Sequence, residues 1–326
     1  MSHTNLRCPA DLIAAAPGLL GFVPTNSMVV YLLHDEPTKG IGVRCAARFD
    51  ITVTTDQAAD FPTVCNLRSG KFAAAILLAI CEQRHDGHAR HLLDAVREGL
   101  QHNRIPILRR LYARDVTEPG QWLDADTGDY GDTYPYTDSV LTAQLVHAGT
   151  PIRRSRSDIE SEFSPLQPAP PAEVGNHGEL VTSTAEEIGA VLNGTPITSP
   201  TLATRAGIVI TGHPALRDAM IGLAIDQPRA GSDLWTHIGR RLRGQPRAEA
   251  LTVAAACLCL AGDTVRAGIA LAAAHEEAEA THTPQPELAV LLTAVLQAGI
   301  EPAKIRAVLR ASAARPGGGD TAPRAH

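Results

Sequence analysis

The stretch that decides the fold of the N-terminal half is LRCPADLIAAAPGLLGFVPTNSMVVYLL, residues 6–33. Its first part, residues 8–16, predicts a short helix. Pro9 suits a first helical position, where its missing N–H costs no hydrogen bond, and Pro17 ends the helix. A Pro-Thr-Asn turn then leads into residues 28–33, a continuous apolar run of strand length. The stretch therefore predicts a helix, a turn and a buried strand.

Further along, strand and helix patterns alternate. Residues 40–49 form a second, partly alternating run, which we expect to pair with the first. Residues 71–81 are the most hydrophobic segment and indicate a central strand buried on both faces, although their alanine content also allows a buried helix. Helical spacing over residues 88–102 and strand character over 105–112 follow. This alternation predicts an α/β domain with a mixed, partly parallel sheet.

We place this α/β domain at residues 1–164, and the rest of the chain differs in composition. Within the domain, the Asp, Gly, Tyr and Pro content of residues 122–136 favours an irregular loop. Residues 165–178 are Pro-rich and predict a stiff linker. Residues 179–311 predict a mainly helical domain, whose residues 250–284 are similar to a single tetratricopeptide hairpin. The Gly, Pro and Ala content of residues 312–326 predicts a disordered tail.

The opening motif resembles that of a known family. Leu19, Leu20, Gly21, Phe22, Pro24 and Ser27, followed by the apolar run, are similar to the opening of the actinobacterial domain-of-unknown-function family 4192. Trp122 and its polar loop resemble the family's tryptophan segment, and Arg156 sits where the family has an arginine before a short acidic helix. The resemblance spans the chain up to about Leu309. It implies a fold but no substrate, because no activity is established for the family.

Composition narrows the classes of function. Hydrophobic residues make up 44% and charged residues 20%, as in ordinary globular proteins. The formal net charge of −6 argues against a general nucleic-acid binder, which needs a basic face. The six cysteines show no paired framework, which favours reduced thiols. We find no signal peptide and no apolar run of the roughly 18 residues that a membrane helix needs. These observations predict a cytoplasmic protein.

The densest polar cluster is HDGHARH, residues 85–91, where a strand is expected to end and a helix to begin. Ligands of open parallel sheets bind at the carboxyl ends of strands, so His85, Asp86 and His88 are ligand-binding candidates. With His91 they are also weak candidates for a zinc site. The structural alternative is that Asp86 caps the helix and the histidines form a solvated first turn. We favour that alternative over a metal, and we predict no metal.

Three other groups could carry function. One group is a set of four carboxylates that could bind a divalent cation: Asp124, Asp126, Asp129 and Asp132. Their spacing does not match an EF-hand loop, so we favour a solvated acidic loop. Arg156 and its neighbouring arginines, with Arg7, could bind phosphate or an acidic partner, although ion pairing at a helix end is the simpler reading. A second arginine cluster either complements a helix dipole or binds a partner; its partner-binding candidates are Arg240, Arg241 and Arg243.

No complete catalytic motif is present. A Walker loop, a GxGxxG fingerprint and a GxSxG elbow are all missing, so no cofactor is predicted. Our first hypothesis is a cytoplasmic, non-enzymatic interaction or regulatory protein whose helical domain presents a groove to a protein partner. The alternative is a small-molecule-binding or hydrolytic enzyme that uses the residues near His85, with help from Arg7, Ser27 or Trp122. DNA binding would need a basic recognition helix, which we do not find.

Overall fold

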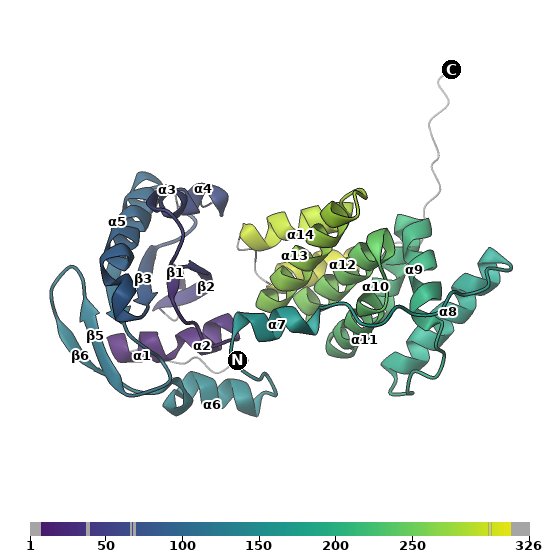
Figure 1. Ribbon diagram of the computed structural model, residues 1–326, viewed down its shortest axis with the longest axis horizontal. Helices are drawn as coiled ribbons and strands as arrows, with labels where there is room; N and C mark the ends of the chain where they lie inside the picture. Colours follow the sequence, from purple (N-terminus) through teal and green to yellow (C-terminus); the bar gives the residue numbers. More distant parts are fainter. Residues whose placement is uncertain are drawn as a thin grey trace, which may run out of the picture. The chain divides into compact units, whose positions relative to one another are not determined.

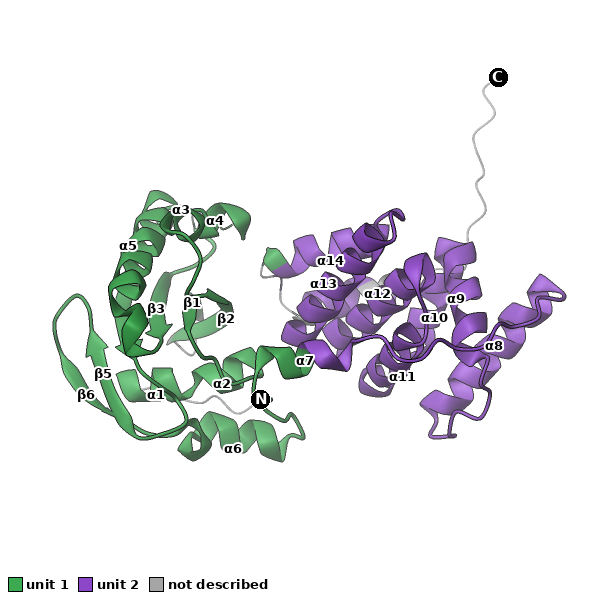
Figure 2. Ribbon diagram, viewed as in Figure 1, with its two compact units in different colours: residues 1–159, 297–299 green, residues 160–296, 300–326 purple. Residues whose placement is uncertain are grey.

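The computed structural model describes residues 8–36, 40–65, 67, 70–298, 300 and 302–313 (Figure 1). The chain divides into two compact units (Figure 2). The first unit comprises residues 1–159 and 297–299, and the second comprises residues 160–296 and 300–326. Among the described residues, no helix is both long and apolar enough to cross a membrane.

The first unit is built on a six-stranded mixed sheet of order β2-β1-β3-β4-β5-β6. Neighbouring strands are antiparallel except β3 and β4, which are parallel and are joined through helix α5. This β3–α5–β4 unit is the part of the fold that positions the site. The strands are β1 (Ser27–Glu36), β2 (Gly40–Asp50), β3 (Ala74–Ile80), β4 (Ile107–Ala113), β5 (Gly120–Asp124) and β6 (Tyr130–Thr133).

Helices cover both faces of this sheet (Figure 1). One face packs on α3 (Thr55–Ala59), α4 (Phe61–Val64) and α5 (Asp86–His102), where Leu77 of β3 and Leu92 of α5 belong to one buried cluster. The other face meets α1 (Pro9–Ala14) and α2 (Ala16–Leu20), and α6 (Val140–His147) packs on α2. There the fully buried Tyr31 donates a hydrogen bond of 3.0 Å to the Leu12 carbonyl. All seven residues of β3 are buried, which confirms the predicted central strand.

The opening motif has a structural role. Gly21 ends α2 in the left-handed region, with φ of 75°, which glycine adopts without strain. Phe22 then forms a parallel bridge with Arg153, and the Val23 amide donates to the Arg153 carbonyl at 3.0 Å. The motif therefore ties the start of the unit to the segment before α7 (Arg156–Glu162).

The predicted loop over residues 122–136 is wrong, because its first part forms the antiparallel hairpin β5–β6. The Asp124 carboxylate accepts the backbone N–H groups of Asp126 and Thr127 and so shapes the turn, while Gly128 takes a φ of 74°. Gly131 lies directly opposite Trp122, whose indole ring covers it. The hairpin depends on these hydrogen bonds in its turn. Its strands have few of the β-branched residues that are typical of strands, so the sequence pattern does not predict them.

The second unit is helical, as predicted. Its central helix α12 is buried along almost all of its length from Arg247 to Leu260. Gly231 and Gly239 of α11 face α12, where an added Cβ would meet Cys257 Sγ at 3.1 Å and Leu251 Cδ2 at 3.0 Å. Small residues thus let these helices approach closely. The helices are α8 (His177–Leu192), α9 (Leu202–Gly212), α10 (Pro214–Leu223), α11 (Pro228–Arg240), α12 (Gly244–Ala261), α13 (Thr264–Ala280), α14 (Glu287–Gln297) and α15 (Pro302–Ala313).

The Pro-rich segment differs from the expected linker. The two units divide between Ile159 and Glu160, so residues 165–178 belong to the second unit. The Leu166 amide donates to the Arg240 carbonyl at 2.7 Å, and the Ala169 amide donates to the Arg241 carbonyl at 2.9 Å. These hydrogen bonds hold the segment against the end of α11. At the other end of the unit, α15 extends to Ala313, and the rest of the predicted tail lies outside the described residues.

Candidate functional site

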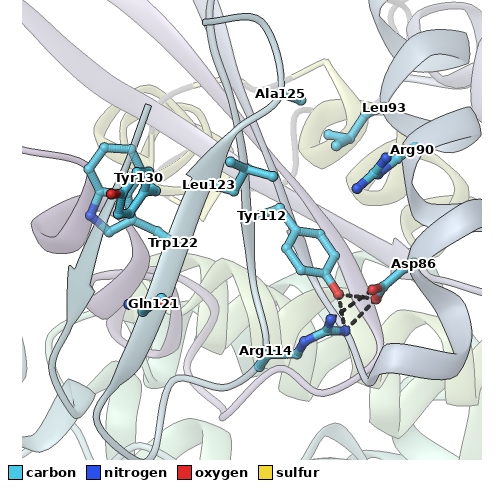
Figure 3. A pocket seen from close by; sticks show the side chains of 10 residues that line it. All are labelled: Asp86, Arg90, Leu93, Tyr112, Arg114, Gln121, Trp122, Leu123, Ala125 and Tyr130. Atoms are coloured by element: carbon cyan, nitrogen blue, oxygen red, sulfur yellow. Dashed lines mark hydrogen bonds and ion pairs between the residues drawn. The ribbon is translucent and has the colours of Figure 1, made fainter. Parts of the chain in front are cut away.

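A pocket of about 410 Å³ opens at the carboxyl ends of the parallel strands β3 and β4 (Figure 3). The first turns of α5 form one wall, and the β5–β6 hairpin forms the other. This is the edge of the sheet where open α/β folds bind ligands. The lining residues are Asp86, Arg90, Leu93, Tyr112, Arg114, Gln121, Trp122, Leu123, Ala125 and Tyr130.

Three side chains form a hydrogen-bonded network at the base of this pocket. Arg114, the residue after β4, donates from Nη2 to Asp86 Oδ2 at 2.7 Å and from Nη1 to Asp86 Oδ1. The Tyr112 hydroxyl also donates to Asp86 Oδ1, and Arg114 Nη1 contacts the same hydroxyl. In Figure 3 the three groups point toward one another. The carboxylate of Asp86 is therefore held from both sides.

This network fixes the charge of its members near neutral pH. The hydrogen bonds from Arg114 lower the pKa of Asp86. The hydrogen bond from Tyr112 and the charge of Arg90 lower it further. Burial raises the pKa of Tyr112, and its hydrogen bond to Asp86 raises it further. Asp86 is thus an anion and Tyr112 a neutral phenol over a wide range around pH 7. Neither group is tuned to exchange protons there.

The pocket nevertheless keeps a positive character. Arg90 and Arg114 bring two cations against the single carboxylate of Asp86. The 17-residue helix α5 begins here with no side-chain hydrogen bond capping its first turn. The dipole of this helix adds partial positive charge at the same place. The electrostatics of the pocket therefore favour an anion.

An apolar and aromatic row lies beside these charges. Tyr112 pairs with Leu123 across β4 and β5, and Leu123 pairs with Tyr130 across β5 and β6. Paired residues point to the same face of a sheet, so the three side chains line up across three strands on the α5 side. The Tyr130 side chain is 75% exposed, although it is a large aromatic residue. This row offers a flat surface to a planar or apolar group.

Comparison with known proteins identifies the family. The family model of the domain of unknown function DUF4192 matches residues 9–303, which include most of both units and the whole pocket. The chain belongs to the DUF4192 family. No curated protein and no solved structure matches it. Since the family's description assigns no chemistry, the case for a function in this DUF4192 chain rests on the geometry above.

The structure brings only part of the predicted site together. Asp86 and Trp122 line the DUF4192 pocket, whereas His85 and His88 are not among its lining residues. His88 Nε2 lies 2.9 Å from the Val53 carbonyl, so this ring packs away from the pocket. His91 is exposed on α5. Among the described residues, no group of three His, Cys, Asp or Glu side chains could hold a metal ion.

Ser27 and the acidic segment have structural roles. Ser27 is fully buried; its hydroxyl donates to the Thr25 carbonyl at 2.7 Å and accepts from Arg48 Nε at 2.8 Å. Asp124 is buried and paired with Arg109 at 2.9 Å, so the expectation of a solvated acidic loop is wrong there. Asp126 Oδ1 likewise accepts from Arg110 Nε at 2.9 Å.

The arginine candidates lie elsewhere. Arg7 is outside the described residues, and Arg156 begins α7 and does not line the pocket. Arg240 Nε donates to the Ser164 carbonyl at 2.9 Å, and Arg243 donates to the carbonyls of Leu242 and Leu166. Their guanidinium groups thus hold the Pro-rich segment. Arg241 Nε is buried without a hydrogen-bond partner among the described residues.

Eight of the ten lining residues are not predicted from the sequence, among them the charged and aromatic Arg90, Tyr112, Arg114 and Tyr130. One signal could have found Arg114. It follows the strand that runs parallel to β3, so the reasoning that singled out the residues after β3 also applies to it. Tyr130 cannot be found in this way, because the composition of residues 122–136 predicts a loop.

Proposed function

We propose that the first unit binds a small anionic molecule that also carries a planar or apolar group. The observation that carries this proposal is the placement of Arg90, Arg114 and the start of α5 beside the row of Tyr112, Leu123 and Tyr130. The anionic group would meet the positive end of the pocket. The planar group would lie along the aromatic row.

We propose binding rather than catalysis. Asp86 is held by two donors that lower its pKa, and Tyr112 has a raised pKa, so neither supports general acid–base chemistry near pH 7. The hydrolytic alternative relies on His85, Asp86 and His88, of which only Asp86 lines the pocket. A volume of about 410 Å³ falls in the range of pockets that bind small molecules.

A regulatory, cytoplasmic role fits this proposal. All six cysteines are free thiols, and Cys81, Cys257 and Cys259 are buried, which supports a reducing compartment. In the second unit α12 and α13 form a hairpin through the left-handed Gly262, and we take this hairpin as a tetratricopeptide-like element. Such elements serve interaction rather than chemistry.

The experiment is a calorimetric titration with ligand pairs that differ by one anionic group: AMP against adenosine, and salicylate against phenol. We expect the anion of at least one pair to bind at least about tenfold tighter than its neutral partner, since a charge-assisted hydrogen bond contributes about 1.5–3 kcal/mol. Arg90→Ala should remove this preference. Arg84→Ala is the matched control, because Arg84 is exposed near the same helix start but does not line the pocket. Equal binding of charged and neutral partners would contradict the proposal.

A further inference from the structure

The second unit carries an apolar groove of about 450 Å³ between α10, α14 and α15. Leu291 of α14 and Val308 of α15 line it and are 63% and 64% exposed. Exposed apolar surface that is grouped in a hollow is typical of an interaction site, whereas single exposed apolar residues are common. The apolar lining consists of Ile221, Leu288, Leu291, Leu292, Val295, Ile300, Ile305 and Val308.

The side chains of α14 make one continuous stripe along this groove. Leu288, Leu291, Leu292 and Val295 follow the i, i+3, i+4, i+7 spacing that puts residues on one helix face. Leu292 is 4% exposed and anchors α14, while Leu291 stays open. On α15, Ile305 and Val308 continue the lining at a spacing of three residues. The groove therefore presents an apolar helix face, as surfaces that bind amphipathic helices do.

One end of the groove carries excess negative charge. Arg217 of α10 pairs with Asp218 at 2.9 Å and approaches Glu249 at 3.6 Å, and Glu287 lies beside them. Burial raises the pKa of Glu249, and the charges of Asp218 and Glu287 raise it further. Asp218 and Glu249 thus share one guanidinium and Glu287 adds a third negative charge, so a further cation there would relieve their repulsion. Lys304 on α15 is the other cation of the lining.

We propose that this groove binds an amphipathic helix of a partner protein, whose apolar face lies along α14 and α15 and whose Lys or Arg pairs with Asp218 and Glu287. This is the helix-in-groove mode of recognition, in which apolar anchors supply the affinity. The charge pair fixes the direction of the bound helix and selects among partners.

The chain's own C-terminal residues do not fit this role. Residues 314–326 read ARPGGGDTAPRAH and contain no Leu, Ile, Val, Met or aromatic residue. Proline and glycine also disfavour a helix there. The segment has nothing with which to fill an apolar groove, so we assign the occupant to a partner.

The test uses fluorescence anisotropy with the full-length protein and three labelled helical peptides of about 18 residues, which is five turns. The first peptide has Leu at the i, i+3, i+4, i+7 positions and two Lys residues at one end. The second replaces the Lys residues by Glu, and the third replaces the Leu residues by Gln. We expect the first peptide to bind at least tenfold more tightly than either of the others. Equal binding of all three would overturn the proposal.

Matched variants locate the site. Leu291→Arg should weaken the first peptide at least tenfold, while Val290→Arg should leave its affinity within twofold. Val290 is the adjacent residue of α14 and is 51% exposed, but it does not line the groove. Glu287→Lys, an exposed charge reversal, should shift the preference toward the Glu peptide, even if Leu291→Arg perturbs the fold. Equal effects of the Leu291 and Val290 variants would overturn the proposal. So would a wild-type dimer that Leu291→Arg dissociates, since a second copy would then fill the groove.

Discussion

The Arg114 guanidinium donates two hydrogen bonds to the carboxylate of Asp86, although the two residues lie 28 positions apart in the sequence. Asp86 opens α5, and Arg114 follows the end of β4, so the contact closes the β3–α5–β4 unit at the edge where the pocket lies. The guanidinium also lies 5.1 Å from the Tyr112 ring centre. This contact is both a structural clamp and the floor of the proposed binding site.

The clamp should make a modest contribution to stability. Arg114 is 45% exposed and Asp86 31% exposed, so solvent screens their attraction. Arg114→Gln should lower the free energy of unfolding by about 1 kcal/mol, measured by urea denaturation. A double-mutant cycle with Asp86→Asn should give a coupling of about 0.5–1 kcal/mol. Strictly additive losses would show that the two side chains act independently.

The same clamp predicts a pH dependence. The folded-state pKa of Asp86 lies below its usual value of 3.8, so its stabilising effect is complete well above pH 3.8 and is lost as pH falls through the folded-state pKa. The difference in unfolding free energy between wild type and Asp86→Asn should be constant from pH 6 to 8 and should shrink below about pH 4. A difference that stays unchanged down to pH 3 would contradict this assignment.

Gly131 should be intolerant of a side chain. A Cβ at this position would lie 2.9 Å from Trp122 Nε1 and 3.0 Å from its Cε2, so the rigid indole would have to move. Gly131→Ala should cost about 1–2 kcal/mol of unfolding free energy. Gly268→Ala in α13 is the control. An added Cβ meets nothing within 4 Å there, and helix propensity predicts a gain of about 0.5–1 kcal/mol. If Gly131→Ala proved neutral, the packing of Trp122 on Gly131 would not be needed for the hairpin.

The Pro-rich segment should be ordered on the second unit. The Leu166 and Ala169 amides donate to the carbonyls of Arg240 and Arg241, so both should show slow hydrogen exchange, resolved by NMR. Arg240→Ala removes the hydrogen bond to the Ser164 carbonyl and should speed exchange at both amides. Arg229→Ala provides a control at the opposite end of α11. Exchange at the rate of a free peptide would restore the interpretation as a spacer.

Some of this architecture was readable from the sequence, and some was not. The apolar run around Leu77 predicted β3, because a strand buried on both faces needs no polar alternation. The position of Asp86 after that strand also predicted it as a site residue. The same reasoning applies to Arg114 after β4, but the contact between Arg114 and Asp86 depends on the parallel pairing of β3 and β4, which no local pattern predicts.

The β5–β6 hairpin shows the opposite difficulty. Its polar residues read as a solvated loop, yet Asp124 is 2% exposed and bound to Arg109. Buried ion pairing between distant positions gives an acidic segment a defined conformation that composition does not reveal. For this reason the sequence does not predict the hairpin that forms this wall of the pocket and carries Tyr130.

Native mass spectrometry of the protein, purified without added ligand from the organism that makes it, tests the central claim most directly. We expect a population that carries a small anionic molecule, lost in Arg90→Ala and kept in Arg84→Ala. An apo mass for all three proteins, or a bound species that survives Arg90→Ala unchanged, would contradict an anion-binding pocket at the end of β3 and β4.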